Sequence, residues 1–258
     1  MDQSHKFSGV LSCTRYAFAP NYYHYCGPDT RGDLGEYLER ELADKGLVEH
    51  LTKFETLYPY LRAIAAANSI SDPLDQRVVE AYWVGNGLLE KVSERDVFKA
   101  LTEFQHLPKR LPKKEMRWLL PKIDRRARLH HSFHVFNVFT RTGHHTVKQT
   151  VETMDECRVS WGKVISDKRP FDQLRARQAT SNKIYIKSQK IGYEKGKMEM
   201  RPAVREVMVL DEPLAKRLKP GDWVSVHWGF VCDRLTEMQV KQLEKYTLHH
   251  LKLANETI

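Results

Sequence analysis

The chain has 258 residues, of which 41% are hydrophobic and 10% aromatic. This composition is typical of globular proteins and excludes a wholly disordered chain, and the length allows one large domain or two small ones. Four scattered cysteines without a CxxC pair exclude a disulfide scaffold and argue against a structural zinc finger. The chain opens without a signal-peptide pattern and has no run of eighteen apolar residues. We therefore expect a cytoplasmic protein with no membrane partner.

The formal net charge is +9, and the basic excess is spread over both halves of the chain. The densest basic runs lie at 109–114 and 122–128. A nucleic-acid-binding patch has this composition, ideally with aromatic residues between the basic ones. A solvated basic linker is the simpler interpretation, because charge in a sequence is weak evidence for a partner. We therefore do not expect nucleic acid to be the main partner.

The first half has the apolar spacing of helices. Five apolar stripes at this spacing fall between about residues 33 and 104, and they predict a helical bundle. Segment 15–29 comes before them and contains Pro20 and Gly27, so we predict a loop-like arm there.

The second half changes to the alternating pattern of strands, in segments 157–164, 183–187, 205–210 and 222–231. Thr236 and Gln239 form a capping-box pattern that predicts a C-terminal helix. The predicted fold class is therefore α+β, with an N-terminal α-helical domain followed by a small OB-like β-barrel with a C-terminal helix. The predicted boundaries are 1–125 for the helical domain, 126–150 for a basic, histidine-rich connection, and 151–258 for the barrel and helix.

The segment 222–231 reads as one strand with two distinct faces. Val224 and Val226 fall on one face, whereas Ser225 and His227 fall on the other. If the valines fill the core, His227 points away from it.

Two stretches of the second half match known motifs. Residues 221–230 read Gly-Asp-Trp-Val-Ser-Val-His-Trp-Gly-Phe, and residues 157–164 read Cys-Arg-Val-Ser-Trp-Gly-Lys-Val. They resemble the closing signature and the opening Cys-Leu-x-x-Pro-Gly-x-Val of the HypC/HupF family of nickel–iron hydrogenase maturation chaperones. The resemblance covers about residues 154–250. The N-terminal half more weakly resembles an uncharacterised bacterial family encoded among hydrogenase genes.

The resemblance implies a chaperone rather than an enzyme. Its cargo would be the iron of the hydrogenase active site, with cyanide and carbon monoxide ligands. Cys157 would be the iron ligand and His227 its neighbour, and a thiolate with an imidazole is a reasonable donor set for iron. The implied partners are the hydrogenase large-subunit precursor and a maturation scaffold protein.

The chain departs from the family pattern at two positions. In the family the cysteine becomes the N-terminal residue, with its free amine nearby, whereas Cys157 is internal. Trp161 stands where the family has proline. A buried strand cysteine that behaves as a small hydrophobe is therefore the alternative for Cys157.

Two further groups of residues could ligate a metal. His24 and Cys26 lie close together in segment 15–29, where the alternative is an aromatic arm packed over the bundle. His130 and His134 share a face whether their segment is a helix or a strand, and His131 lies beside them. For these three histidines a histidine-rich surface is the simpler interpretation.

Two other functions remain open. A metal-dependent enzyme of the same pathway would use His24, Cys26 and the histidines of 130–145, which include His144 and His145. A nucleic-acid-binding OB module is the second alternative. The sequence has no GxGxxG, P-loop or GxSxG motif that would indicate a conventional enzyme.

Overall fold

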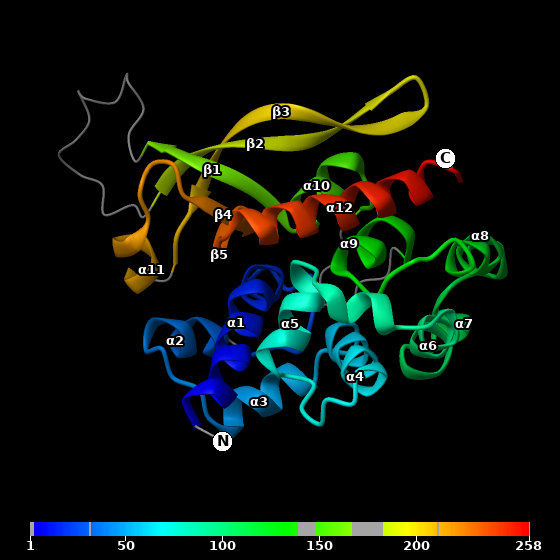
Figure 1. Ribbon diagram of the computed structural model, residues 1–258, viewed down its shortest axis with the longest axis horizontal. Coiled ribbons are helices and arrows are strands. Elements are labelled where there is room, and N and C mark those ends of the chain that lie inside the picture. The colour runs from blue at the N-terminus through cyan, green and yellow to red at the C-terminus, as the bar shows by residue number, and fades with distance from the viewer. Residues whose placement is uncertain (1–2, 31, 139–147, 167–182, 211, 258) are drawn as a thin grey trace.

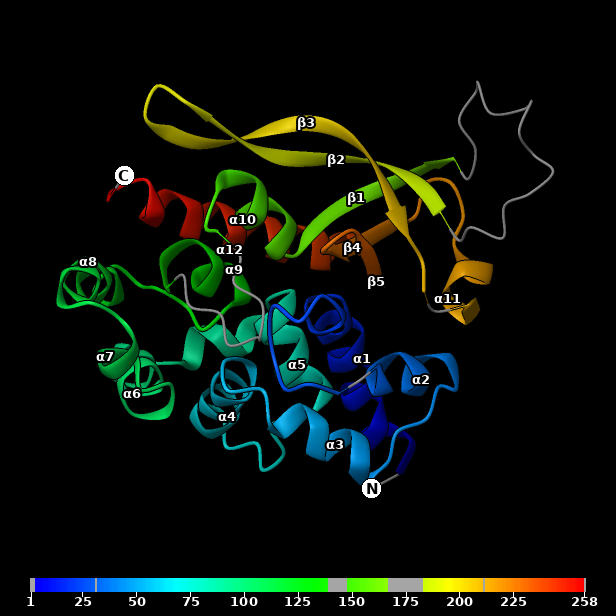
Figure 2. The same cartoon turned by 180° about the vertical axis from the view of Figure 1, so that it is seen from behind.

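The computed structural model describes residues 3–30, 32–138, 148–166, 183–210 and 212–257. Figures 1 and 2 show the chain in two parts, a helical part at the N-terminal side and a β-sheet with the last helix packed on it. His144 and His145 lie outside the described ranges. Among the described helices, none combines the length and the apolar character that a membrane span requires.

The helical character predicted for the first half is confirmed. Its elements are α1 (Gln3–Tyr22), α2 (Asp33–Glu39), α3 (Lys45–Thr52), α4 (Leu57–Ala67), α5 (Gln76–Trp83), η1 (Gly87–Lys91), α6 (Glu94–Lys99), η2 (Ala100–Phe104), α7 (Leu107–Arg110), α8 (Lys113–Ile123), α9 (His131–Phe133) and η3 (His134–Val138).

The prediction of a loop-like arm is wrong for residues 15–22, which belong to α1. Val10, Cys13 and Ala17 are buried at helical spacing, so packing against the other helices keeps this segment helical. Pro20 lies in the last turn of α1, where it removes one backbone donor and does not break the helix.

The second half contains a five-stranded sheet. Its elements are α10 (Val151–Cys157), β1 (Ser160–Ser166), β2 (Lys183–Glu194), β3 (Lys197–Met208), α11 (Glu212–Arg217), β4 (Trp223–His227), β5 (Phe230–Leu235) and α12 (Glu237–Ala254). The strands pair in the order β1-β2-β3-β5-β4, and β4 pairs back to β1, so the ring of pairings is closed. The pairs are antiparallel apart from a parallel bridge between Met208 and Phe230. The β2–β3 hairpin extends past the sheet and over α10 and α12 (Figure 1).

Two strand predictions need correction. Segment 222–231 is a hairpin and not one strand, because Trp228 and Gly229 adopt φ of 50° and 77° and make the two-residue turn that joins β4 to β5. Cys157 is the last residue of α10 and not part of a strand. The Thr236–Gln239 capping box of α12 is confirmed.

The facing of β4 agrees with the sequence pattern. Val224 and Val226 belong to the apolar cluster inside the sheet, together with Val164, Ile186 and Val207. His227 lies on the opposite face and contacts the helical part.

One hydrophobic cluster joins the two parts of the chain. It contains Tyr16 and Tyr82 from the helices together with Trp161, Phe230 and Leu243 from the sheet and α12. Of the predicted connection 126–150, the described residues 126–138 are also largely buried, whereas 148–150 are exposed. The predicted division into a helical domain at 1–125, a connection at 126–150 and a barrel with its helix at 151–258 stays a prediction.

Candidate metal centre

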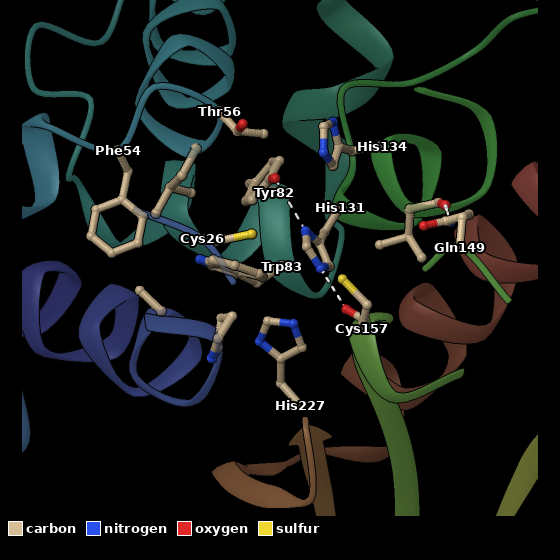
Figure 3. Close-up of a pocket in the computed structure, with 14 residues that line it drawn as sticks. Cys26, Phe54, Thr56, Tyr82, Trp83, His131, His134, Gln149, Cys157 and His227 are labelled. Carbon is tan, nitrogen blue, oxygen red and sulfur yellow. Dashed lines mark hydrogen bonds between the residues drawn. The ribbon is translucent and has the colours of Figure 1, made fainter. Parts of the chain in front are cut away.

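Three metal-ligating side chains from distant parts of the chain converge where the helical part meets the sheet. They are His131 at the start of α9, Cys157 at the end of α10 and His227 at the end of β4. Their donor atoms all lie within 4.8 Å of one another, and all three residues are buried (Figure 3). One thiolate and two imidazoles form a donor set used for zinc, iron and copper in proteins. We call these three residues the ligand group.

Cys157 is positioned by the two ends of α10. Thr150 caps the N-terminus of the helix by accepting from the backbone N–H of Thr153 at 3.2 Å. At the other end, Arg158 is fully buried, and its Nε donates to Asp155 at 2.9 Å while its Nη2 donates to the Gln189 carbonyl of β2 at 2.6 Å. The buried ion pair therefore holds the chain on both sides of Cys157.

Trp161 occupies the position at which the resemblance expects proline. Its ring lies under the Arg158 guanidinium, with the guanidinium carbon 5.6 Å from the ring centre. The side chain is buried in the cluster that joins the two parts of the chain. Trp161 therefore packs against the residue that follows Cys157 and supports the same end of α10.

His227 is fixed by a bond to the main chain of α1. Its Nδ1 lies 2.7 Å from the carbonyl oxygen of Tyr16. In a regular helix this carbonyl would accept from residue 20, but Pro20 has no N–H to donate. Because a carbonyl oxygen only accepts, Nδ1 carries the proton, and Nε2 is the nitrogen that offers a lone pair.

His131 is held at both ring nitrogens. Nε2 lies 2.7 Å from the Cys157 carbonyl oxygen, so it is the donor in this bond. Nδ1 therefore accepts from the Tyr82 hydroxyl at 3.1 Å. Figure 3 shows the sulfur of Cys157 beside the Nε2 side of the ring. Nε2 is therefore the nitrogen of His131 that faces Cys157.

The electrostatic environment keeps His131 uncharged. Burial, followed by the proximity of His227, lowers the pKa of His131 well below its ordinary value. Burial raises the pKa of Tyr82 well above its ordinary value, so its hydroxyl stays protonated. A neutral imidazole is the form that binds a metal ion.

A small cavity of about 40 Å³ adjoins the ligand group. Its walls are mostly apolar and include Ala17, Pro20, Phe54, Leu57 and Val135. Cys26, His134 and Gln149 also line it. A cavity of this size can hold a few water-sized molecules next to the three ligands.

The structure separates the residues that the sequence singled out. Cys157 and His227 meet as the resemblance implies, and His131 joins them. His134 lines the cavity with its Nδ1 3.3 Å from the Tyr60 hydroxyl, but it is not in the ligand group. The histidine-rich surface is wrong for His130, His131 and His134, because packing of α12 and the sheet buries all three.

The remaining predicted metal ligands, His130, His24 and Cys26, lie outside the ligand group. His130 accepts from Ser132 and stacks on Tyr246 of α12, so it faces away from the ligand group. His24 lies in the turn after α1 with φ of 58° and outside the ligand group. Cys26 follows in the same turn and reaches the cavity. The sequence did not predict that Tyr16 and Tyr82 hold the two histidines of the site. Pro20 is the one local feature that indicates a carbonyl of α1 without its usual helical donor.

The fold and the site define a protein of mixed helices and β-sheet with a buried group of one cysteine and two histidines at the junction of its two parts. Residues 5–258 match the model of DUF6390, which is described as a family of unknown function. The chain therefore belongs to this family. Comparison with curated proteins and with solved structures gives no match.

Proposed function

We propose that this protein binds a transition-metal ion through His131, Cys157 and His227, and that it acts as a maturation chaperone of the HypC-like type for nickel–iron hydrogenase. The observation that carries the proposal is the convergence of the three donor atoms within 4.8 Å. Two of the three residues are those that the HypC/HupF resemblance selects. The ion is cargo in this proposal, and iron is the cargo that the resemblance favours.

The sheet supports the proposal at the level of the fold. An OB-like barrel would require five strands whose pairings form a closed ring, and the pairing of β4 with β1 supports this proposal. Cys157 ends the helix that leads into the first strand, and His227 ends the fourth strand. An OB-like barrel of the HypC type would therefore carry both residues at one end, next to each other.

His131 would take the place of the N-terminal amine that Cys157 lacks. Because Cys157 is internal, no N-terminal amine accompanies it, and the helical part supplies an imidazole in its neighbourhood instead. To bind an ion, Nε2 of His131 must give up its proton, which moves to Nδ1. The Tyr82 hydroxyl can accept from Nδ1–H as readily as it now donates to Nδ1, so it supports both tautomers.

Metal analysis of the protein purified without oxygen tests metal binding directly. We expect one equivalent of iron or of added cobalt(II), and loss of that equivalent in Cys157→Ala. Cys232→Ala is the matched control, because Cys232 is also a buried thiol but lies outside the ligand group. Equal metal content in the two variants, or no metal in the unmodified protein, would overturn the proposal.

The chaperone role needs a second measurement. A tagged protein isolated anaerobically from cells that express hydrogenase genes should bring down the large-subunit precursor or a scaffold protein. Infrared spectra of the eluate should show cyanide and carbonyl stretches that vanish in Cys157→Ala. Metal binding without these partners would remove hydrogenase maturation and leave a metal-binding protein.

A metal-dependent enzyme is the second candidate. The cavity beside the ligand group favours it, because catalytic metal sites keep a position open for water or substrate. Turnover of a small substrate by the metal-loaded protein, lost in His227→Gln, would select this function over cargo transport.

A further inference from the structure

The cavity beside the ligand group is lined by a second thiol, from the turn that follows α1. Cys26 and Cys157 both line it, and Figure 3 shows the Cys26 sulfur directed into the space beside Tyr82 and Trp83. We propose that Cys26 is the transfer thiol of the site, which takes the metal ion from a donor at the surface and passes it to Cys157. This inference rests on the proposed metal-binding function.

The turn that carries Cys26 is built in a defined conformation. The side-chain amide of the buried Asn21 donates to the carbonyl oxygens of Cys26 and Pro28 at 3.1 and 2.7 Å. Thr30 holds this amide in place by donating to its oxygen at 2.6 Å. The backbone from Cys26 to Pro28 is thereby fastened to the end of α1.

Gly27 brings the turn close to the cavity wall. Its φ of +87° lies in the left-handed region, and a Cβ there would stand 2.3 Å from the ring of Phe54. Phe54 itself lines the cavity. Glycine at this position therefore allows the turn to press against the wall and directs the neighbouring Cys26 inward.

Exposure distinguishes Cys26 from the other cysteines. Cys13, Cys157 and Cys232 are buried, whereas Cys26 is partly exposed. Burial raises the pKa of Cys13 to about 12 and also raises that of Cys232. A thiol that exchanges ligands with a carrier must be reachable and must form a thiolate. Among the four cysteines, Cys26 is the one that is partly exposed and also lines the cavity.

The transfer is a ligand exchange without a change of oxidation state. The ion first binds the Cys26 thiolate, which has released its proton to solvent. The Cys157 thiol then loses its proton as its sulfur bonds to the ion, and the bond to Cys26 breaks. Cys26 recovers a proton, so the charge balances and no oxidant or reductant is needed.

Rapid mixing with cobalt(II) separates a transfer role from a resident ligand. We expect Cys26→Ser to slow both cobalt uptake and removal by a chelator at least about tenfold, with an unchanged dissociation constant. Cys13→Ser is the control, because Cys13 is buried in α1 and does not line the cavity. Unchanged rates in Cys26→Ser would overturn the proposal. A dissociation constant that weakens in step with a faster release would also overturn it, since Cys26 would then be a permanent ligand.

Alkylation of the metal-free protein gives a readout that does not depend on metal binding. N-ethylmaleimide should modify Cys26 well before Cys157, as located by peptide mass spectrometry. If Cys157 reacts as fast as Cys26, the ion can reach it directly and the transfer role fails while the metal site stands. If cobalt(II) does not bind the unmodified protein at all, the proposed function itself fails.

Discussion

The imidazole of His227 donates from Nδ1 to the backbone carbonyl of Tyr16 at 2.7 Å, across 211 positions of sequence. The carbonyl is available because Pro20, four residues further along α1, has no N–H. The Tyr16 hydroxyl also lies 2.9 Å from Ser225 Oγ. The outer face of β4 is thus fastened to α1 at two points, which leaves Nε2 of His227 as the nitrogen that can bind an ion.

The hydroxyl of Tyr82 should strengthen metal binding by supporting His131. In Tyr82→Phe, Nδ1 of His131 loses its partner and the ring loses its fixed orientation. Removal of such an outer hydrogen bond typically weakens metal binding tenfold to a hundredfold, and we expect about tenfold here. A competition titration with a chromophoric chelator measures the change in dissociation constant.

Tyr60→Phe is the control for this variant. The Tyr60 hydroxyl is likewise buried and bonds to Nδ1 of His134, a histidine outside the ligand group. Its loss should leave metal affinity unchanged. An equal weakening in both variants would mean that the tyrosines act only through general stability.

Metal binding should stabilise the whole chain and not only one part, because the ligands come from α9, α10 and β4. At a free metal concentration one hundred times the dissociation constant, the free energy of unfolding rises by about 2.7 kcal/mol. Thermal unfolding followed by circular dichroism should show one transition that moves upward with cobalt(II). The shift should disappear in His227→Gln, and two transitions of which only one moves would contradict a shared site.

The ion pair between Asp155 and Arg158 should be important for stability. In Asp155→Ala the Arg158 guanidinium, whose side chain is fully buried, loses its carboxylate partner. Such a loss costs about 3–5 kcal/mol in the free energy of unfolding, measured by urea denaturation. Glu49→Ala removes an exposed pair with Lys53, which solvent screens, so it should change the free energy of unfolding far less. Similar costs for the two variants would show that the buried pair is not important.

Lys122 should make the stability depend on pH in the alkaline range. Burial lowers the pKa of Lys122 from 10.5 to about 8, against the opposing effect of Glu256. Between these values the unfolded chain binds more protons than the folded chain, so the contribution of Lys122 to the free energy of unfolding rises with pH. Below pH 8 both states are protonated, and the cost of the buried charge is present in full.

Denaturation at a series of pH values checks this dependence. Lys122→Met should remove the rise between pH 8 and 10.5, whereas Lys113→Met, an exposed lysine of the same helix, should keep it. A rise of equal slope in Lys122→Met would assign the dependence to other groups.

The features that could be predicted from the sequence are those that short-range interactions control. Apolar spacing predicted the helical first half, and the Thr236–Gln239 pair predicted the start of α12. Alternation placed His227 on the face of β4 opposite Val224 and Val226. Each of these depends on backbone hydrogen bonds and side-chain directions within a few residues, which a local pattern records. The alternating pattern did not predict the turn at Trp228 and Gly229. The residue types continue to alternate through this left-handed turn, although the strand ends there.

The membership of the ligand group depends on long-range packing and could not be predicted from local patterns. Of the three neighbouring histidines, His131 reaches Cys157, while His130 turns to α12 and His134 to Tyr60. All three lie in one short segment, and their different surroundings follow from packing against elements that are distant from one another in the sequence. Pro20 indicates that the carbonyl of Tyr16 lacks its usual helical donor. No local pattern indicates that His227 donates to this carbonyl instead. A local pattern can show that a donor is missing, whereas only the packed chain brings His227 to supply it.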